Sequence, residues 1–421
     1  MSTSFIEELR WRKMLHNITP GVEEFLASGS RKGYIGFDPT ADSLGVGNLV
    51  QVMMLVHFQR AGHEPVALLG GATGMIGDPS FKAEERKLLS KDILNENLSS
   101  QRLQIEKLLN NSAIVLDNNE WFRNFNFLDF IRDVGKHITV NYMLAKDSVK
   151  SRQDSGISFT EFSYQLIQAF DFHFLSKNKK IRLQMGGSDQ WGNITTGIEL
   201  NRRMGGENSY AITTPLIKKA DGTKFGKTES GNIWLDPKRT SPYKFYQFWL
   251  NSSDEDSSDY IRIFTTKSKT EIEDIEEKHR KEPHLRILQK ELALDVTKRV
   301  HSEQDANNAT KTSEILFGKG TTEMLKELSE NDLLDVFSGV PIINVSSELF
   351  NPGISVINLV TANSSLFKSR GEAKKLIQAG AVSVNKSKAS LDDFINQTDF
   401  LKDKYLVVQK GKKNYALVIL E

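Results

Sequence analysis

A chain of 421 residues with 38% hydrophobic side chains can form two or three domains with a sizeable core, which excludes wholesale disorder. Its net charge of +1 excludes a uniformly basic nucleic-acid coat, though not a local basic patch, and the absence of cysteine excludes disulfides, a thiolate nucleophile and cysteine-based metal sites. The N-terminus carries charges where a signal peptide needs an apolar core, and no apolar run approaches the roughly 18 residues of a membrane span, so we expect a cytoplasmic protein with no membrane partner.

The first part of the chain alternates short apolar runs with longer amphipathic ones. Four runs predict buried strands that end near glycine: residues 34–37, 64–71, 111–116 and 181–187. Strands alternating with helices favour an α/β fold with a parallel sheet covered on both faces. Ligands of such sheets bind beyond the C-terminal strand ends, where these glycines lie. Residues 1–250 hold 31 Lys or Arg and 27 Asp or Glu, a net charge of +4.

The middle of the chain predicts a small, acidic helical domain. Its polar start at residues 251–259 is typical of a loop or domain boundary. The sequence has a helical period from Lys267 onward. One apolar stripe is expected from Leu285, Leu288, Leu292, Val296 and Val300. Residues 251–350 hold 13 Lys or Arg against 21 Asp or Glu, a net charge of −8.

The last part predicts a small α+β module after a second boundary at about Gly353. Ser369 and Glu372 fit a capping box for a helix that ends near Gly380, and a strand follows. Residues 405–420 predict a hairpin. Residues 351–421 hold 11 Lys or Arg against 6 Asp or Glu, a net charge of +5. The predicted divisions are 1–246, 247–338, a linker at 339–352, and 353–421.

A glycine-rich turn at residues 34–48 is the first candidate site. It leads from a strand through Asp38 and Thr40 into an apolar helix. Glycines allow phosphates to approach closely, and a helix N-terminus attracts anions. A tight turn without a ligand is the alternative. Residues 70–80 do not match the dinucleotide pattern G-x-G-x-x-G, and residues 221–228 are not a Walker motif because Asp221 replaces the required glycine.

A helical segment at residues 163–172 is the second candidate. The spacing of Tyr164, Gln168 and Asp171 places all three on one helix face. A polar ligand would satisfy these groups among apolar neighbours, whereas the alternative is a face that simply meets water.

Two further loops carry charged groups. Asp189 follows the strand at 181–187 and predicts a ribose or amine contact, or else a helix cap. Lys224 and Lys227 lie in a glycine-punctuated loop at 220–232 that could bring two cations onto developing phosphate charge, or be an ordinary surface turn.

Together these segments closely resemble bacterial tyrosyl-tRNA synthetases, which are class I aminoacyl-tRNA synthetases. The segments that carry the resemblance are YIGFDPTADSLGVGN, GGATGMIGDPS, RDVGKHITVNYMLAK, GISFTEFSYQLIQAFDF, QMGGSDQWGN and KADGTKFGKTESGNIWLD. The resemblance covers nearly the whole chain and is strongest to about residue 250. It implies a Rossmann-like catalytic domain, an α-helical anticodon-binding domain and a C-terminal RNA-binding module. It also implies formation of tyrosyl-adenylate from tyrosine and ATP, followed by transfer to tRNA(Tyr).

The resemblance also assigns residues. Tyr34 and Asp171 would bind the phenol hydroxyl of tyrosine, Asp78, Tyr164 and Gln168 its ammonium group, and Gln190 would lie near its carboxylate. ATP contacts would come from Gly36, Asp38, Gly47, Gly187, Asp189 and Lys227, with Asn118 a further polar residue of the site. The catalytic positions would be Thr40, Gly45, Asn48, Lys82, Arg86, Lys224, Lys227 and Thr228. Mg²⁺ is expected with ATP, held by phosphates and water rather than by protein ligands.

One position departs from the family pattern. The first signature of class I synthetases reads His-x-Gly-His, and here it is Gly45-Val46-Gly47-Asn48. Asn48 can still donate a hydrogen bond, but Gly45 has no side chain with which to stabilise the phosphates, so slow activation with normal tyrosine binding is predicted. The alternatives are a non-catalytic tRNA-binding relative that keeps the tyrosine pocket, and a synthetase for another aromatic amino acid, against which Tyr34 and Asp171 argue.

Two surfaces of the chain suggest macromolecular partners. SRGEAKKLIQAGAVSVN resembles the signature of a small RNA-binding module, and tRNA contacts are expected from Arg370, Lys374, Lys375 and Gln378. A solvated cationic helix face is the alternative. Residues 127–144 match the region that pairs subunits in the family and predict a homodimer, although an internal helix pair would leave the same pattern.

Overall fold

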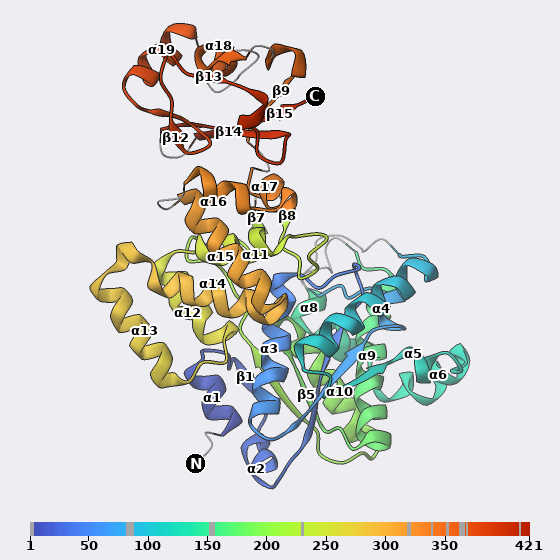
Figure 1. The fold of residues 1–421 in the computed structure, drawn as a ribbon. Coiled ribbons are helices and arrows are strands. Elements are labelled where there is room, and N and C mark those ends of the chain that lie inside the picture. The colour runs from blue at the N-terminus through green and yellow to red at the C-terminus, as the bar shows by residue number, and fades with distance from the viewer. Residues whose placement is uncertain are drawn as a thin grey trace. The chain divides into compact units, whose positions relative to one another are not determined.

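The structure is a computed structural model (Figure 1). It describes residues 4–80, 88–150, 156–228, 231–317, 321–337, 340–350, 353–361, 367, 369–411 and 414–421, with only the backbone described at 148, 316, 317 and 349. The chain divides into two compact units. Met1–Thr240 and Trp249–Val300 make up the first, and Ser241–Phe248 and His301–Glu421 make up the second.

Within the described part of the first unit, a six-stranded sheet forms the centre. The strand order is β1-β6-β5-β2-β3-β4, and every pair is parallel except β1 with β6. The strands are β1 (Asn17–Ile18), β2 (Lys32–Phe37), β3 (Glu64–Leu69), β4 (Ile114–Asp117), β5 (Leu183–Gly187) and β6 (Tyr210–Thr214). The four predicted strands and their parallel arrangement are confirmed. The chain order reverses between β2 and β5, which is where α/β sheets bind ligands.

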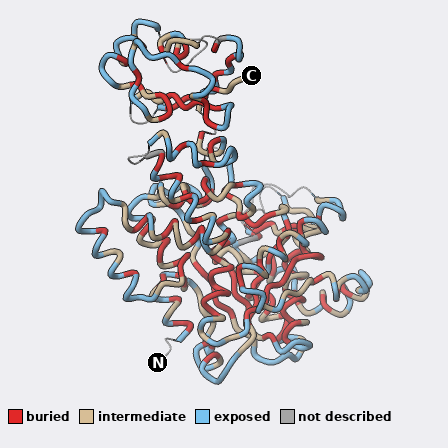
Figure 2. The backbone as a smooth tube through the Cα atoms, viewed as in Figure 1, coloured by how far each residue is buried: buried red, intermediate tan, exposed pale blue. Residues whose placement is uncertain are grey.

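Helices cover both faces of this sheet. Gly33 of β2 lies against α3 (Val46–Arg60), because a Cβ at this glycine would be 2.9 Å from the Phe58 ring. The next residue, Tyr34, meets Phe172 of α9 (Phe159–Lys179) edge to face, with ring centroids 5.5 Å apart. Successive strand residues point to opposite faces, so α3 and α9 lie on opposite sides of the sheet. Figure 2 shows the buried core running between these layers.

Other helices complete this unit. α10 (Trp191–Arg203) packs along α9, and α4 (Lys91–Leu108) packs against α3 and β3. The shorter elements are α1 (Phe5–Trp11), α2 (Val22–Ala27), η1 (Thr73–Met75), α5 (Asn119–Phe122), α6 (Phe127–Asp133), η2 (Gly135–His137), α7 (Val140–Leu144), α8 (Asp147–Lys150), η3 (Ser188–Gln190), β7 (Lys227–Thr228) and β8 (Gly231–Asn232). Among the described helices, none is long and apolar enough to cross a membrane.

The predicted loop at residues 251–259 is wrong from Asp254 onward. There α12 (Asp254–Phe264) begins, followed by α13 (Lys269–Lys281) and α14 (Ile287–Val300). The Ser253 side chain caps α12 by accepting a hydrogen bond from the Asp256 N–H at 3.0 Å. An acidic first turn stabilises the positive end of a helix, so the acidic run forms a helix start rather than a loop.

The predicted apolar stripe of α14 is confirmed with one exception. Its buried members are Leu288, Leu292, Val296 and Val300. Leu285 is 40% exposed because it lies in the separate turn η4 (Pro283–Leu285), which Arg286 ends with a left-handed φ of 53°.

The second unit combines short helices with a five-stranded sheet. Its helices are α11 (Pro242–Leu250, with its last two residues in the first unit), α15 (Glu303–Phe317), α16 (Thr322–Glu327), α17 (Glu330–Val336), η5 (Ser347–Phe350), α18 (Val356–Thr361), α19 (Arg370–Gln378) and η6 (Gln397–Asp399). Its strands are β9 (Ile342–Val345), β10 (Ile354–Ser355), β11 (Val382–Val384), β12 (Ser387–Lys388), β13 (Phe394–Ile395), β14 (Tyr405–Lys410) and β15 (Asn414–Leu420). The main sheet has the order β12-β11-β14-β15-β9 among the described residues.

Local signals in this unit are confirmed. The predicted hairpin is the antiparallel pair β14–β15. The Ser369 side chain caps α19 by accepting from the Glu372 N–H at 3.2 Å, which is one half of the predicted capping box, whereas the Glu372 carboxylate pairs with Lys410 Nζ at 2.8 Å. The range 339–352, expected as a linker, contains β9, which pairs in parallel with β15. Ile343 and Val345 of β9 are buried in the core of this unit, and such a long-range pairing leaves no local mark in the sequence.

Candidate active site

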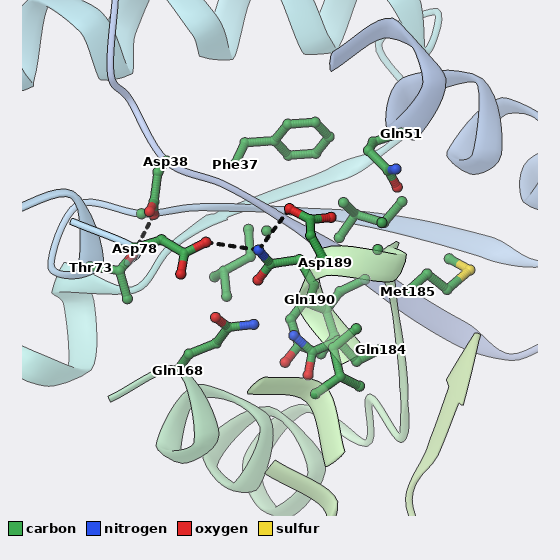
Figure 3. A pocket seen from close by; sticks show the side chains of 18 of the residues that line it. Phe37, Asp38, Gln51, Thr73, Asp78, Gln168, Gln184, Met185, Asp189 and Gln190 are labelled. Carbon is green, nitrogen blue, oxygen red and sulfur yellow. Dashed lines mark hydrogen bonds between the residues drawn. The ribbon is translucent and has the colours of Figure 1, made fainter. Parts of the chain in front are cut away.

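A cavity of about 300 Å³ lies at the C-terminal ends of β2 and β5 (Figure 3). The predicted site residues that line it are Tyr34, Gly36, Asp38, Thr40, Gly47, Asn48, Asp78, Asn118, Tyr164, Gln168, Asp171, Gly187, Asp189 and Gln190. The predicted residues outside this lining are Gly45, Lys224, Lys227 and Thr228. Lys82 and Arg86 lie outside the described residues. Segments far apart in the sequence therefore meet where the sheet topology predicts a ligand.

Helix α9 forms one wall of the cavity. It carries Tyr164, Gln168 and Asp171 on one face, and Tyr164 and Asp171 are 5% and 1% exposed. The alternative of a face that meets water is therefore wrong. Burying these polar groups is costly unless hydrogen bonds compensate, so their partners define the site.

Asp171 is a buried residue of the cavity wall. Its carboxylate accepts hydrogen bonds from Trp121 Nε1 at 2.9 Å and Asn118 Nδ2 at 3.1 Å. Burial raises the pKa of Asp171 to about 8, although these two donors oppose the shift. The Tyr34 hydroxyl is also buried and has no hydrogen-bond partner among the described residues. Burial, and then the nearby Asp171 carboxylate, raise the pKa of Tyr34 well above its usual value, so its phenol stays protonated.

A second network surrounds Asp38. Its carboxylate accepts hydrogen bonds from the Tyr164 hydroxyl and from Thr73 Oγ1, both at 2.8 Å, and Figure 3 shows the Thr73 contact. The Tyr164 hydroxyl thus donates its hydrogen bond to Asp38, a residue that the resemblance assigns to ATP binding. The hydroxyl oxygen of Tyr164 can still accept a hydrogen bond.

A third network offers negative charge and carbonyl oxygens to the cavity. Gln190 Nε2 donates to Asp78 Oδ2 at 2.7 Å (Figure 3), and Asn193 Nδ2 donates to Gln168 Oε1 at 3.1 Å. Asn193 also lies 3.4 Å from Asp78 Oδ1. A carboxylate next to amide oxygens suits a ligand ammonium group.

The first signature forms the N-terminus of α3. The Gly45 N–H donates to Asn48 Oδ1 at 3.1 Å, so the Asn48 carbonyl caps the helix and its NH₂ group can face a ligand. Gly47 and Asn48 line the cavity, and the α3 N-terminus favours an anion there. Gly45 has φ −87°, and a Cβ at this residue would lie 3.6 Å from the Ile233 carbonyl oxygen. A side chain is therefore sterically allowed at this position.

The second signature lies directly against the first. Gly226 has φ +80°, and a Cβ there would be 2.7 Å from Val46 Cγ1, so only glycine fits. The Ile233 N–H donates to the Gly226 carbonyl at 3.1 Å, and Ile233 in turn accepts from the Val46 N–H at 2.9 Å. The two signatures are thereby adjacent, and the side chains of Lys224 and Lys227 are exposed.

Several residues of the site were missed in the sequence. They are Gln51, Thr73, Trp121, Gln184 and Asn193. Asn193 and Trp121 each lie three residues after a recognised position, Gln190 and Asn118, which is a usable helical spacing signal. The Gln184 side chain lies beside Tyr34 in the β2–β5 register, and that pairing is a property of the sheet alone.

The predicted RNA-binding residues share one face of α19. Arg370, Lys374, Lys375 and Gln378 are all exposed, whereas Ala373 and Ile377 are buried. This face is available to phosphates.

In the described parts of the chain, no group of three or more histidine or acidic residues could hold a metal ion.

This chain belongs to the class I tRNA synthetases of the tryptophan and tyrosine group, whose family description "tRNA synthetases class I (W and Y)" matches residues 28–318. Its parallel-sheet core is the Rossmann-like core of that class. Residues 332–418 match a second family, described as "Tyrosine--tRNA ligase SYY-like C-terminal domain".

Among its relatives are proteins named tyrosine–tRNA ligase. One from Cytophaga hutchinsonii is 57% identical over 99% of both chains, and one from Bacteroides fragilis is 55% identical over 99% of both chains. A C-terminally truncated mitochondrial tyrosyl-tRNA synthetase from Aspergillus nidulans matches with a TM-score of 0.68 and 29% identity, covering 75% of this chain and 95% of the other. These matches give no support to the alternative of a non-catalytic relative.

Proposed function

We propose that the protein is a tyrosine–tRNA ligase, which joins tyrosine to ATP as tyrosyl-adenylate with release of pyrophosphate and then transfers the tyrosyl group to tRNA(Tyr). The observation that carries the proposal is the buried part of the cavity wall, where the Tyr34 hydroxyl, which has no hydrogen-bond partner among the described residues, lies near the Asp171 carboxyl group. A phenol can satisfy both groups. A phenylalanine side chain would leave the Tyr34 hydroxyl without a partner among the described residues, and an unpaired buried polar group costs about 1–3 kcal/mol.

The remaining networks fit the rest of the amino acid. Asp78 and Gln168 offer oxygens to its ammonium group, with the Tyr164 hydroxyl oxygen as a further acceptor, and Gln190 lies next to Asp78 on the side where the carboxylate reacts. The carboxylate attacks the α-phosphate of ATP without a covalent enzyme intermediate. The protein therefore contributes orientation and charge stabilisation.

ATP fits the other half of the cavity. Gly36, Gly47 and Gly187 leave room for its phosphates and ribose, and Asp189 offers a carboxylate to the ribose. Asp38, Thr40 and Asn48 lie between the two halves, and Lys224, Lys227 and Thr228 would reach the leaving pyrophosphate from the adjacent loop. Lys82 and Arg86 would reach the same pyrophosphate. Mg²⁺ would neutralise phosphate charge when it arrives with ATP, held by phosphates and water.

The RNA parts of the proposal rest on surface charge and similarity. Residues 247–338 would bind the anticodon side of tRNA, and residues 353–421 would bind RNA through the exposed face of α19. Contacts of this kind go to phosphates and weaken with salt. Since charging of tRNA supplies translation, we place the protein in the cytoplasm.

We also propose a homodimer. Residues 127–144 and Phe159 expose large apolar side chains around a groove of about 710 Å³. The most exposed of the lining side chains are Phe127 at 65%, Val140 at 58% and Phe159 at 66%, and Leu128, next to Phe127 in the sequence, is 72% exposed. Clustered exposed apolar groups are typical of an interface, and a second copy of the same chain is the partner expected from the family resemblance.

The decisive experiment for the catalytic proposal is amino-acid-dependent exchange of pyrophosphate into ATP. Tyrosine, tryptophan and phenylalanine are compared at equal concentration. Exchange with tyrosine alone supports the proposal. Faster exchange with tryptophan or phenylalanine would refute it, and so would no exchange above the background without enzyme.

A further inference from the structure

The loop of the second signature is attached to α12 by an aromatic ring. Phe225 is half-buried and packs against three rings of the same unit. Its ring centroid lies 5.0 Å from Tyr260, 5.4 Å from Phe264 and 5.9 Å from Trp249, and it stacks on Phe264 with an interplanar angle of 18°. Such pairs add specific orientation to ordinary apolar packing.

The partners of Phe225 form a buried aromatic cluster. Trp249 and Phe264 are fully buried and Tyr260 is 3% exposed. They also contact one another, with the Trp249 and Phe264 centroids 4.8 Å apart. A second contact ties the same loop to the same helix, because the Ala220 N–H donates to Asp256 Oδ1 of α12 at 2.8 Å.

The residue after Phe225 fixes the loop from the other side. Gly226 lies against Val46 and Gly47 of the first signature, as its blocked Cβ position shows. Phe225 and Gly226 thus hold the loop between α12 and the α3 N-terminus. Lys224 and Lys227 are the residues on either side of this pair. Phe225 and Gly226 therefore fix the backbone positions from which the two ammonium groups extend.

We infer that Phe225 is a positioning residue for the activation step: its packing in the Trp249–Tyr260–Phe264 cluster sets the placement of Lys224 and Lys227 over the pyrophosphate. This inference rests on the proposed function and adds a residue that does not touch substrate. It also makes α12, a helix outside the cavity, part of the machinery of the ATP step.

The test compares Phe225→Ala with Phe225→Met. Methionine keeps apolar bulk and makes sulfur–aromatic contacts, so it is the conservative variant. A small displacement of catalytic groups lowers rates by about 10²-fold, and we expect Phe225→Ala to lower kcat/KM for ATP in pyrophosphate exchange by about 10- to 100-fold. The Kd for tyrosine should not change, and Phe225→Met should recover most of the rate.

A second variant probes the base of the cluster. Phe264→Leu removes the stacked ring from α12 without touching the loop lysines. This variant should also lower kcat/KM for ATP. Its effect should add little to that of Phe225→Ala, because both substitutions remove the same contact between the rings of Phe225 and Phe264. Full additivity of the two effects would overturn the inference, as would an unchanged kcat/KM in Phe225→Ala or a parallel loss of tyrosine binding.

Hydrogen–deuterium exchange separates this inference from the proposed function. Phe225→Ala should speed exchange of the amides in residues 218–228, and Phe225→Met should not. This measurement needs no activity. If the wild-type protein shows no tyrosine-dependent pyrophosphate exchange, the proposed function is refuted. If hydrogen exchange of the amides is unchanged in Phe225→Ala, the anchoring role of Phe225 is refuted.

Discussion

Gly45→His is the substitution that best tests how the first signature works. Position 45 is the N-cap of α3, and its φ of −87° is open to any residue. A Cβ would make ordinary contacts, 3.6 Å from the Ile233 carbonyl oxygen and 3.7 Å from Asn48 Oδ1. Because the backbone already has room for a side chain, the variant should fold like the wild type and present an imidazole beside Gly47 and Asn48.

The expected gain is set by one hydrogen bond to the transition state. A preorganised donor to developing oxyanion charge contributes about 10²–10³ in kcat. We therefore expect Gly45→His to raise kcat for tyrosine-dependent pyrophosphate exchange at saturating ATP by up to that factor, with an unchanged Kd for tyrosine. Glycine is a better N-cap than most residues, so the substitution should lower the free energy of unfolding by about 1 kcal/mol or less.

Gly45→Ala is the matched control. It makes the same change at the helix cap without a donor, so it should lose the same stability and gain no rate. Equal exchange rates for wild type and Gly45→His, with both proteins folded, would show that the phosphates are stabilised without a side chain at position 45.

Four other predictions concern charge, domains and assembly. The pKa of Asp171 is raised to about 8 in the free protein. A tyrosine phenol that donates a hydrogen bond to Asp171 stabilises the ionised carboxylate and lowers this pKa. Tyrosine binding at pH 7 should therefore release a proton, and the affinity for tyrosine should increase as the pH rises toward 8. Calorimetry in buffers of different ionisation enthalpy measures this, and an equal proton release by Asp171→Asn would contradict it. In the free protein the same raised pKa should make the free energy of unfolding fall between about pH 4 and pH 8. Deleting residues 353–421 should impair tRNA charging and spare pyrophosphate exchange, and equal loss of both would refute the division. Phe127→Asp should halve the mass measured by light scattering, whereas Phe394→Asp, at a 63% exposed phenylalanine of the other unit, should leave it unchanged. A monomeric wild type would rule out the dimer.

Local sequence patterns were reliable where the cause is local. The strands β2, β3, β4 and β5 follow from short apolar runs that end in glycine or polar residues, and the capped helix α19 follows from Ser369. The prediction of a loop for the acidic run that begins α12 was wrong, because acidic residues favour both loops and helix starts. Only the Ser253 cap distinguishes the two.

Long-range partners could not be read from the chain. The helical spacing predicted that Asp171 and Tyr164 share one helix face. It could not predict their partners: Asp171 accepts hydrogen bonds from Trp121 and Asn118, and Tyr164 donates one to Asp38. Each bond joins residues 50 to 126 positions apart, so it exists only once the sheet and α9 have been packed together.

The sequence by itself determined the parallel α/β core, the residue types at the cavity and the missing side chain at Gly45. These features depend on residue identity and on periods of two or 3.6 residues, both visible in one dimension. Tertiary structure decided that a cavity of about 300 Å³ joins these residues, that the Tyr34 hydroxyl has no hydrogen-bond partner among the described residues, and that Phe225 ties the second signature to α12. Those facts depend on burial and on distances across the fold, because whether a polar group is satisfied or an aromatic ring is anchored is settled by which distant residues packing brings beside it.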